Sequence, residues 1–205
     1  MRLYSMPGAC SLAANIALRE AGIPFELVKV SHRTHKTSDG VDFTQINSKG
    51  YVPALVLDTG ELLTENTALL QYIADLNPDA HLAPPAGTLE RYRLSEWLAY
   101  LNSEVHKSFS PLFAPNASDD MKQYARDNLT KRLGWLAQQL GSKPYLLGEQ
   151  FTVADAYLFV TLSWSGLAGV DLSPWPTLKA FQERVAARPS VIEAMTAEGL
   201  FRKKS

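Results

Sequence analysis

Cys10 in the segment PGACS is the only cysteine of this chain and therefore its only thiol. Residues 2–5 suit a strand, the PGAC segment suits a turn, and residues 11–21 suit a helix with Ser11 as N-cap and Gly22 after its end. Backbone N–H groups and the helix dipole at such a turn stabilise a thiolate and lower the thiol pKa below its usual value of about 8.5. A thiolate there can attack a disulfide or hold a thiol-containing ligand, whereas the structural alternative is a small buried apolar side chain.

Two further segments carry groups that suit a small peptide-like ligand. Pro53 in YVPAL begins a predicted strand, and a cis bond would turn the backbone of Val52 toward a ligand, although a first strand position also tolerates proline for structural reasons. Glu65 and Asn66 begin the next predicted helix, where an amide and free N–H groups can bind a carboxylate and Glu65 can bind an ammonium. The structural alternative is N-capping by Thr64 or Asn66.

A polar stripe follows the apolar face of the segment LERYRLSEWLAYLNSEVHK, which predicts a helix. His106 lies on this stripe and, with an ordinary pKa near ~6.5, can donate or accept a proton or act as a positive neighbour of a thiolate. A stripe of this kind is often only solvated. Its members are Ala99, Asn102, Ser103, His106 and Lys107.

Composition excludes several classes of function. The net charge of −1 over 205 residues gives no broad attraction to nucleic acid or anionic membranes. One cysteine cannot form an intramolecular disulfide, and no Cys/His set has zinc-site spacing; His32 and His35 lack a third ligand, so we expect no metal. His35 or Lys36 can instead meet a ligand carboxylate. No stretch approaches the ~18 apolar residues of a membrane span, and we expect a soluble, cytoplasmic protein.

The order of elements predicts two domains. Residues 1–79 follow the order β-α-β, an irregular or helical stretch, then β-β-α, which is the order of an α+β thioredoxin-like domain. Residues 80–85 fall in a proline-rich linker, and the periodicity of residues 86–205 is helical almost throughout, which predicts an all-α helical bundle. Within it, Thr152-x-x-Asp155 has the pattern of a capping box before a helix that is apolar all round.

Four segments together resemble bacterial glutathione transferases, most closely the cysteine-containing beta class. They cover essentially the whole chain and read LYSMPGACSLAANIALREAGIPFELV, NSKGYVPALVLDTGELLTENTALLQYIAD, EWLAYLNSEVHKSFSPLF and FTVADAYLF. The resemblance implies a thioredoxin-like domain followed by an all-helical domain, a homodimer, and glutathione as co-substrate without a metal.

The resemblance also implies roles for individual residues. Cys10, with Ser11 beside it, would contact the glutathione sulfur and can form a mixed disulfide with it, and His106 with Lys107 would reach toward that thiol. The implied glutathione-binding residues include Ser103 and Glu104 from a partner subunit, and the full set is His35, Tyr51, Val52, Pro53, Glu65, Asn66, Ser103, Glu104 and Lys107. Asn66 stands where serine or threonine is common, Ala99 where asparagine can occur and His35 where lysine can bind the glycyl carboxylate, so lower glutathione affinity is expected.

Three hypotheses for function remain at this point. The first is a transferase that directs the glutathione thiolate at an electrophile in an apolar cleft; the second is glutathione-dependent thiol–disulfide exchange with Cys10 as nucleophile. The third is a transferase-like binding module without catalysis. Aromatic and apolar candidates for the cleft are more simply explained as core; they are Phe109, Phe113, Tyr157, Trp164 and Leu167.

Overall fold

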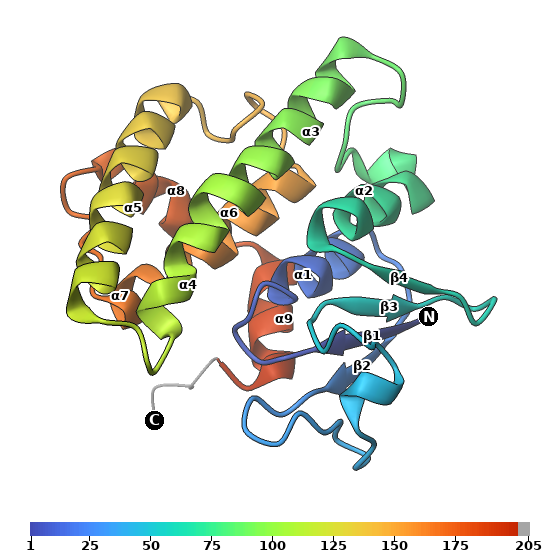
Figure 1. Ribbon diagram of the computed structural model, residues 1–205. Helices are drawn as coiled ribbons and strands as arrows, with labels where there is room; N and C mark the ends of the chain where they lie inside the picture. The colour runs from blue at the N-terminus through green and yellow to red at the C-terminus, as the bar shows by residue number, and fades with distance from the viewer. Residues whose placement is uncertain (201–205) are drawn as a thin grey trace, which may run out of the picture. The chain divides into compact units, whose positions relative to one another are not determined.

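The chain forms two compact units in a computed structural model that describes residues 1–200. The N-terminal unit comprises Met1–Ala83 together with residues 187–200, and the helical unit comprises Pro84–Ala186 (Figure 1). The sequence assigned residues 86–205 to one helical domain, and the structure differs, because α9 (Pro189–Glu198) packs against α1 (Leu12–Glu20). The last helix therefore belongs to the N-terminal unit, and residues 201–205 of the predicted domain lie outside the described residues.

A four-stranded mixed sheet forms the centre of the N-terminal unit, with strand order β2-β1-β3-β4. Strand β1 runs parallel to β2, and β3 runs antiparallel to both β1 and β4. This confirms the predicted thioredoxin-like order, with a 3₁₀ turn, η1 (Phe43–Gln45), in the stretch left open between β2 and β3. The elements are β1 (Arg2–Ser5), α1, β2 (Glu26–Lys29), η1, β3 (Ala54–Val56), β4 (Leu62–Thr64), α2 (Asn66–Leu76) and η2 (Pro78–Ala80).

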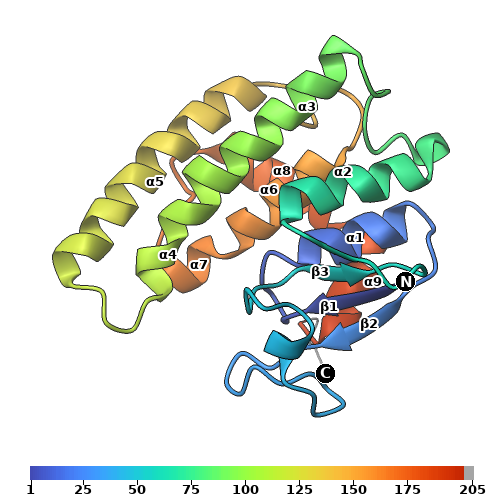
Figure 2. The same ribbon diagram turned by 45° about the vertical axis from the view of Figure 1, so that its right-hand side comes forward.

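Both faces of the sheet are covered. Helices α1 and α2 lie on one face and pack against each other, while η1 lies on the other (Figures 1 and 2). On the η1 side, Phe43 is fully buried in a cluster with Tyr4, Val28 and Ala54, which come from three strands. Because successive strand residues point to opposite faces, Leu3 and Leu55 fill the other face, and both are fully buried.

The helical unit is built from helices, as its periodicity predicts. The apolar stripe of the first helix is buried at Leu94, Leu98, Leu101 and Val105. The structure adds one feature that the sequence did not indicate: residues Leu101–His106 form a π-helical segment, η3. The elements are α3 (Leu89–Tyr100), η3, α4 (Lys107–Phe113), α5 (Asp119–Leu140), α6 (Val153–Ser163), α7 (Ser165–Ala168) and α8 (Pro176–Ala186).

Helix α6 is the buried centre of this unit, and the predicted capping box at its start is present. Asp155 is fully buried, and its carboxylate accepts from the Leu146 N–H at 2.8 Å and from both the N–H and the hydroxyl of Thr152 at 2.8 Å. Burial raises the pKa of Asp155 to about 6, while these hydrogen bonds oppose the rise. Across the described helices, no run has the length and apolarity that a membrane crossing needs.

Replacing Asp155 by alanine leaves three buried donors without their acceptor. We expect Asp155→Ala to lower the free energy of unfolding by about 3–5 kcal/mol, measured by urea denaturation. Asp171→Ala is the matched control, because Asp171 accepts from the Ser173 N–H in an exposed turn and its loss is expected to cost under about 1 kcal/mol. Equal losses for the two variants would contradict the role of the capping box.

Candidate active site

Cys10 lies at the turn between β1 and α1 and is partly exposed. Its Sγ donates to the backbone oxygen of Val52 at 3.3 Å, and the Nδ2 of Asn66 donates to the backbone oxygen of Cys10 at 3.3 Å. The turn, the start of β3 and the start of α2 therefore meet around one thiol, as the sequence predicted.

Behind the thiol, the turn is fixed by buried polar groups. Ser11 occupies the N-cap position of α1, but its side chain makes no capping bond and is fully buried. Its Oγ accepts from the Met6 N–H at 3.1 Å and lies 2.8 Å from the Oγ of Ser5. Ser5 in turn donates to Glu198 of α9 at 2.7 Å. Ser11 thus stands at the N-cap position that the sequence predicted, but its hydroxyl faces β1 and stabilises the turn rather than capping the helix.

Glu198 completes this support. Its carboxylate also accepts from the N–H of Gly8 at 2.9 Å and from the Nδ2 of Asn15 at 3.1 Å. Burial raises the pKa of Glu198, and the Gly8, Ser5 and Asn15 bonds oppose the rise. Gly8 has φ of +75°, a conformation that glycine adopts without the steric cost of a Cβ.

The Val52–Pro53 peptide bond is cis, as the family resemblance implies. Pro53 is buried, Val52 is partly exposed, and the side chain of Tyr51 is 74% exposed. The backbone oxygen of Tyr51 accepts from the Nδ2 of Asn47 at 2.7 Å, which holds the loop ahead of β3.

Glu65 is the N-cap residue of α2, and no side chain caps this helix. The expectation of capping by Thr64 or Asn66 is wrong, because Thr64 ends β4 and Glu65 takes a positive φ of 67° that turns the chain into the helix. The exposed Glu65 carboxylate binds the Nζ of Lys49 at 2.6 Å, and Lys49 also donates to the hydroxyl of Thr64 at 3.0 Å. Sequence reasoning missed Lys49, since nothing in the NSKG turn indicates this partner.

The amide N–H groups of Asn66 were expected to bind a ligand carboxylate, but in the part of the chain that the structure describes it is the amide oxygen that lacks a partner. Its Nδ2 is engaged by the backbone of Cys10, and its Oδ1 is buried without a hydrogen-bond partner among residues 1–200. An unpaired buried acceptor suits an N–H donor and repels a carboxylate. A carboxylate at this place would instead meet the backbone N–H groups of the first turn of α2, which have no intrahelical acceptors.

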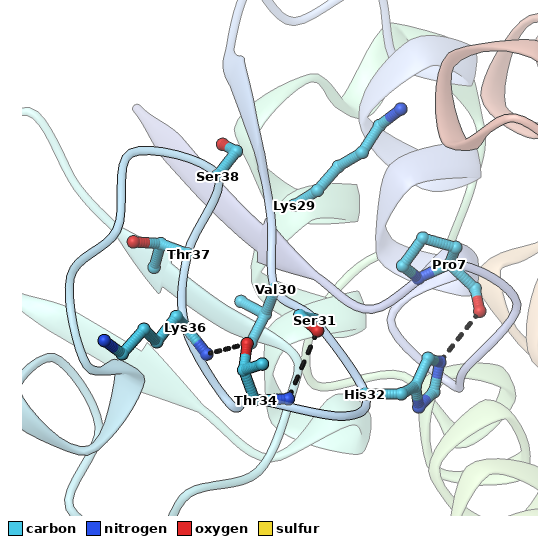
Figure 3. A pocket seen from close by; sticks show the side chains of 9 residues that line it. All are labelled: Pro7, Lys29, Val30, Ser31, His32, Thr34, Lys36, Thr37 and Ser38. Carbon is cyan, nitrogen blue, oxygen red and sulfur yellow. Dashed lines mark hydrogen bonds between the residues drawn. The ribbon is translucent and has the colours of Figure 1, made fainter.

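His35 lies in the exposed loop after β2, with φ of 51°. A pocket of about 300 Å³ opens in the same loop, lined by Pro7 and residues between Lys29 and Ser38 (Figure 3). His32 turns toward the backbone oxygen of Pro7, 3.0 Å from its Nε2, while the ammonium groups of Lys29 and Lys36 point away from each other. The basic groups do not converge, and neither His35 nor Cys10 lines this pocket.

In the helical unit, His106 ends the η3 segment and is held by aromatic side chains. Its Nδ1 lies 2.7 Å from the hydroxyl of Tyr157, and its ring centroid lies 4.9 Å from that of Trp164. The Tyr157 hydroxyl donates to the Oδ1 of Asn102 at 3.1 Å. Sequence reasoning treated Tyr157 as a cleft candidate more simply explained as core, yet a tyrosine within an apolar helix needs a hydrogen-bond partner and so indicates one.

Burial lowers the pKa of His106 to about 4, and the positive charge of Lys107 adds to the shift. The imidazole is therefore neutral at pH 7. In the ligand-free chain, desolvation thus disfavours the charged ring that the role of positive neighbour of a thiolate requires. The other two expected roles of His106, proton donor and proton acceptor, remain.

The other predicted residues of this unit lie along the same helix. The hydroxyl of Ser103 donates to the backbone oxygen of Ala99 at 3.0 Å, Glu104 binds Arg132 at 2.7 Å, and Lys107 is exposed. Among the cleft candidates, Phe109, Tyr157 and Trp164 are buried, whereas Phe113 and Leu167 are 48% and 85% exposed. The described residues contain no group of three His, Cys, Asp or Glu side chains that could hold a metal ion.

The predicted site residues thus fall into two sets, one in each unit. The N-terminal unit brings Cys10, Val52 and Asn66 into contact and adds Glu65 at the start of α2. The helical unit carries Ser103, Glu104, His106 and Lys107 on one continuous helix.

Comparison with known proteins covers both units of the chain. The model of the glutathione S-transferase N-terminal domain matches residues 1–75, and that of the glutathione S-transferase C-terminal domain matches residues 103–196. Glutathione S-transferase GstA of Escherichia coli O157:H7 is 44% identical over 200 residues, which are 98% of this chain and 100% of that protein.

Solved structures give the same result. A beta-class glutathione S-transferase of Sphingomonas chungbukensis is 53% identical with a TM-score of 0.95, and the match covers 98% of this chain and 100% of that one. A sphingomonad glutathione S-transferase complexed with glutathione is 49% identical with a TM-score of 0.94 and the same coverage. The chain therefore belongs to the glutathione S-transferase family, and within it is most similar to the bacterial beta class.

Proposed function

We propose that this glutathione S-transferase binds glutathione around Cys10 and activates its thiol for attack on an apolar electrophile. The observation that carries the proposal is the meeting of Cys10, Val52 and Asn66 in one place, with the Oδ1 of Asn66 buried and unpaired. A buried acceptor without a partner costs free energy until a donor reaches it. An N–H group of a bound peptide-like ligand supplies such a donor when binding uncovers this oxygen, which is closed to solvent in the ligand-free chain.

Each end of glutathione has a counterpart in the N-terminal unit. The γ-glutamyl ammonium pairs with Glu65 in place of Lys49, and its carboxylate binds at the N-terminus of α2. The cysteinyl part pairs with the backbone of Val52 beside Tyr51 and Pro53, and His35 faces the glycyl carboxylate. In this proposal Lys49 occupies the ammonium subsite only while the ligand is absent.

Activation of the thiol comes from the backbone at the start of α1. N–H groups and the helix dipole favour a thiolate at this position, and Cys10 lies there. His106, which is neutral, contributes by accepting a proton, and Lys107 supplies a positive charge. Ser11 acts through the turn that it holds.

The electrophile lies against an apolar surface of the helical unit. Phe113 stacks on Phe109, with ring centroids 6.1 Å apart, and packs edge-on against Trp164, which also contacts the ring of His106. Phe113 and the neighbouring Leu167 remain exposed. An apolar substrate on this surface would therefore lie beside the proposed proton acceptor.

A homodimer completes the site in this proposal. Leu89 and Tyr92 are exposed apolar side chains at the start of α3, and Ala99 and Ser103 are exposed farther along the same helix, with the charged Glu96 between them. Exposed apolar side chains of this kind mark an interaction surface. Its burial against a second copy would bring Ser103, with Glu104, to the γ-glutamyl end of glutathione in the partner.

Glu65→Gln removes the charge that we assign to the ammonium of glutathione. Its dissociation constant, measured by calorimetry, is expected to rise about tenfold or more, because charge-assisted hydrogen bonds contribute about 1.5–3 kcal/mol. Glu61→Gln is the matched control, since Glu61 is exposed and bonds only locally to Thr59. Absence of glutathione binding by the unaltered protein at millimolar concentration would favour a non-catalytic module instead.

Cys10→Ala separates conjugation from thiol–disulfide exchange. If backbone groups activate the bound thiol, conjugation to an aromatic electrophile keeps within about tenfold of the original kcat/KM. Exchange with a disulfide substrate, which uses Cys10 as nucleophile, is expected to vanish. Loss of conjugation by about a thousandfold with folding intact would assign the chemistry to Cys10 itself.

A further inference from the structure

The hydrogen bonds on one side of the His106 ring form a chain that ends at a fixed acceptor. His106 Nδ1 lies 2.7 Å from the Tyr157 hydroxyl, which lies 3.1 Å from the Oδ1 of Asn102. We propose that Tyr157 and Asn102 are positioning residues that hold His106 in its Nδ1–H tautomer and so leave Nε2 as the proton acceptor. The catalytic consequence rests on the proposed function, whereas the tautomer does not.

Which group donates and which accepts along these hydrogen bonds follows from the number of protons available. A tyrosine hydroxyl carries one proton, and here it points to the Oδ1 of Asn102, which can only accept. The Tyr157 oxygen must then accept from His106, and a neutral imidazole that donates through Nδ1 has its lone pair on Nε2. The side chains of Tyr157 and Asn102 thus determine which ring nitrogen is basic.

The fold holds the three groups rigidly. Asn102 and His106 are four residues apart within η3, so they share a helix face, and that segment packs against α6, which carries Tyr157. Tyr157 is fully buried, and its ring is perpendicular to that of His106, with centroids 5.9 Å apart. Trp164 packs against the imidazole as well. Rotation of the imidazole would break the bond to Tyr157.

Among the described residues, one charged group, that of Lys107, acts on the ring and favours its neutral form. Lys107 follows His106 along the chain and its charge lowers the pKa of His106, as burial does more strongly. On the side of α5, Arg132 is paired with Glu104, and on α6 the titratable neighbour is Tyr157. No described carboxylate hydrogen-bonds to the ring.

The proton transfer that this arrangement permits is simple. The S–H bond of glutathione breaks, its electron pair stays on sulfur as a thiolate, and the proton binds Nε2 of His106. The imidazolium then releases this proton to water, because burial and the charge of Lys107 disfavour the charged ring. His106 returns to the neutral Nδ1–H form, with no net change in the ring.

The tautomer is directly measurable in the ligand-free protein labelled with 15N-histidine. We expect long-range 1H–15N spectra at pH 7 to show Nδ1 protonated and Nε2 unprotonated, with the resonances of His106 assigned by their loss in His106→Gln. Protonated Nε2 with unprotonated Nδ1 would overturn the proposal. This readout requires neither glutathione nor catalysis.

Tyr157→Phe removes the hydroxyl that connects His106 to Asn102. We expect a mixture of the two tautomers and a fall in kcat for conjugation of about tenfold with little change in the KM for glutathione. Tyr100→Phe is the matched control, because its hydroxyl donates to the backbone oxygen of Arg132 at 3.1 Å and does not contact His106. Wild-type tautomer and kcat in a folded Tyr157→Phe variant would overturn the proposal.

Asn102→Asp tests which group donates in the hydrogen bond between Tyr157 and Asn102. The substitution keeps the shape of the side chain and replaces its amide nitrogen by an oxygen. Both carboxylate oxygens accept, so the Nδ1–H tautomer persists and the added charge raises the pKa of His106 in a 15N titration. If Asn102 normally donated, the unaltered protein would show the Nε2–H tautomer and Asn102→Asp would switch it to Nδ1–H, which would overturn the assignment. If the unaltered enzyme shows the Nδ1–H tautomer but no transferase activity, the proposed function fails and the positioning of His106 stands.

Discussion

The thiol of Cys10 depends on a buried carboxylate at the other end of the described chain. The turn that carries Cys10 leaves polar groups of β1, the turn and α1 away from water, and Glu198 of α9 accepts from three of them. A buried charge is tolerated only with such partners, and buried donors need such an acceptor. This mutual requirement explains why α9 crosses back to the N-terminal unit rather than ending among the helices that precede it. The reactive turn is therefore a product of long-range folding.

The two units control charge by different physical means. In the N-terminal unit, oriented backbone groups at the starts of α1 and α2 favour negative charge without any titrating side chain. In the helical unit, burial keeps the imidazole of His106 neutral. Dipoles that do not titrate can stabilise a thiolate over a wide pH range, while a neutral base can remove a proton without adding a fixed charge beside an apolar substrate.

Local patterns made part of this architecture predictable. Alternation found the strands, proline in YVPAL marked the start of β3, and Thr152 with Asp155 marked α6, because each signal arises within a few residues. The placement of α9, the ion pair of Lys49 with Glu65 and the positive φ of Glu65 all depend on tertiary contacts or on a backbone turn that no local propensity favours. Cys10, Val52 and Asn66 could be chosen as candidates, but which atom of Asn66 would be free could not.

The π-helical segment η3 shows why such details escape a periodic reading. A widened turn weakens the regular backbone ladder, and here the hydroxyls of Ser103 and Ser108 donate to backbone oxygens four residues earlier, at 3.0 Å and 2.6 Å. The same turn keeps Leu101 and Val105 in the core while Asn102 and His106 reach Tyr157. The apolar stripe in the sequence reflects only the first of these two requirements, the burial of Leu101 and Val105. The second is a hydrogen-bond requirement between helices, and it places the irregular turn where Asn102 and His106 meet Tyr157.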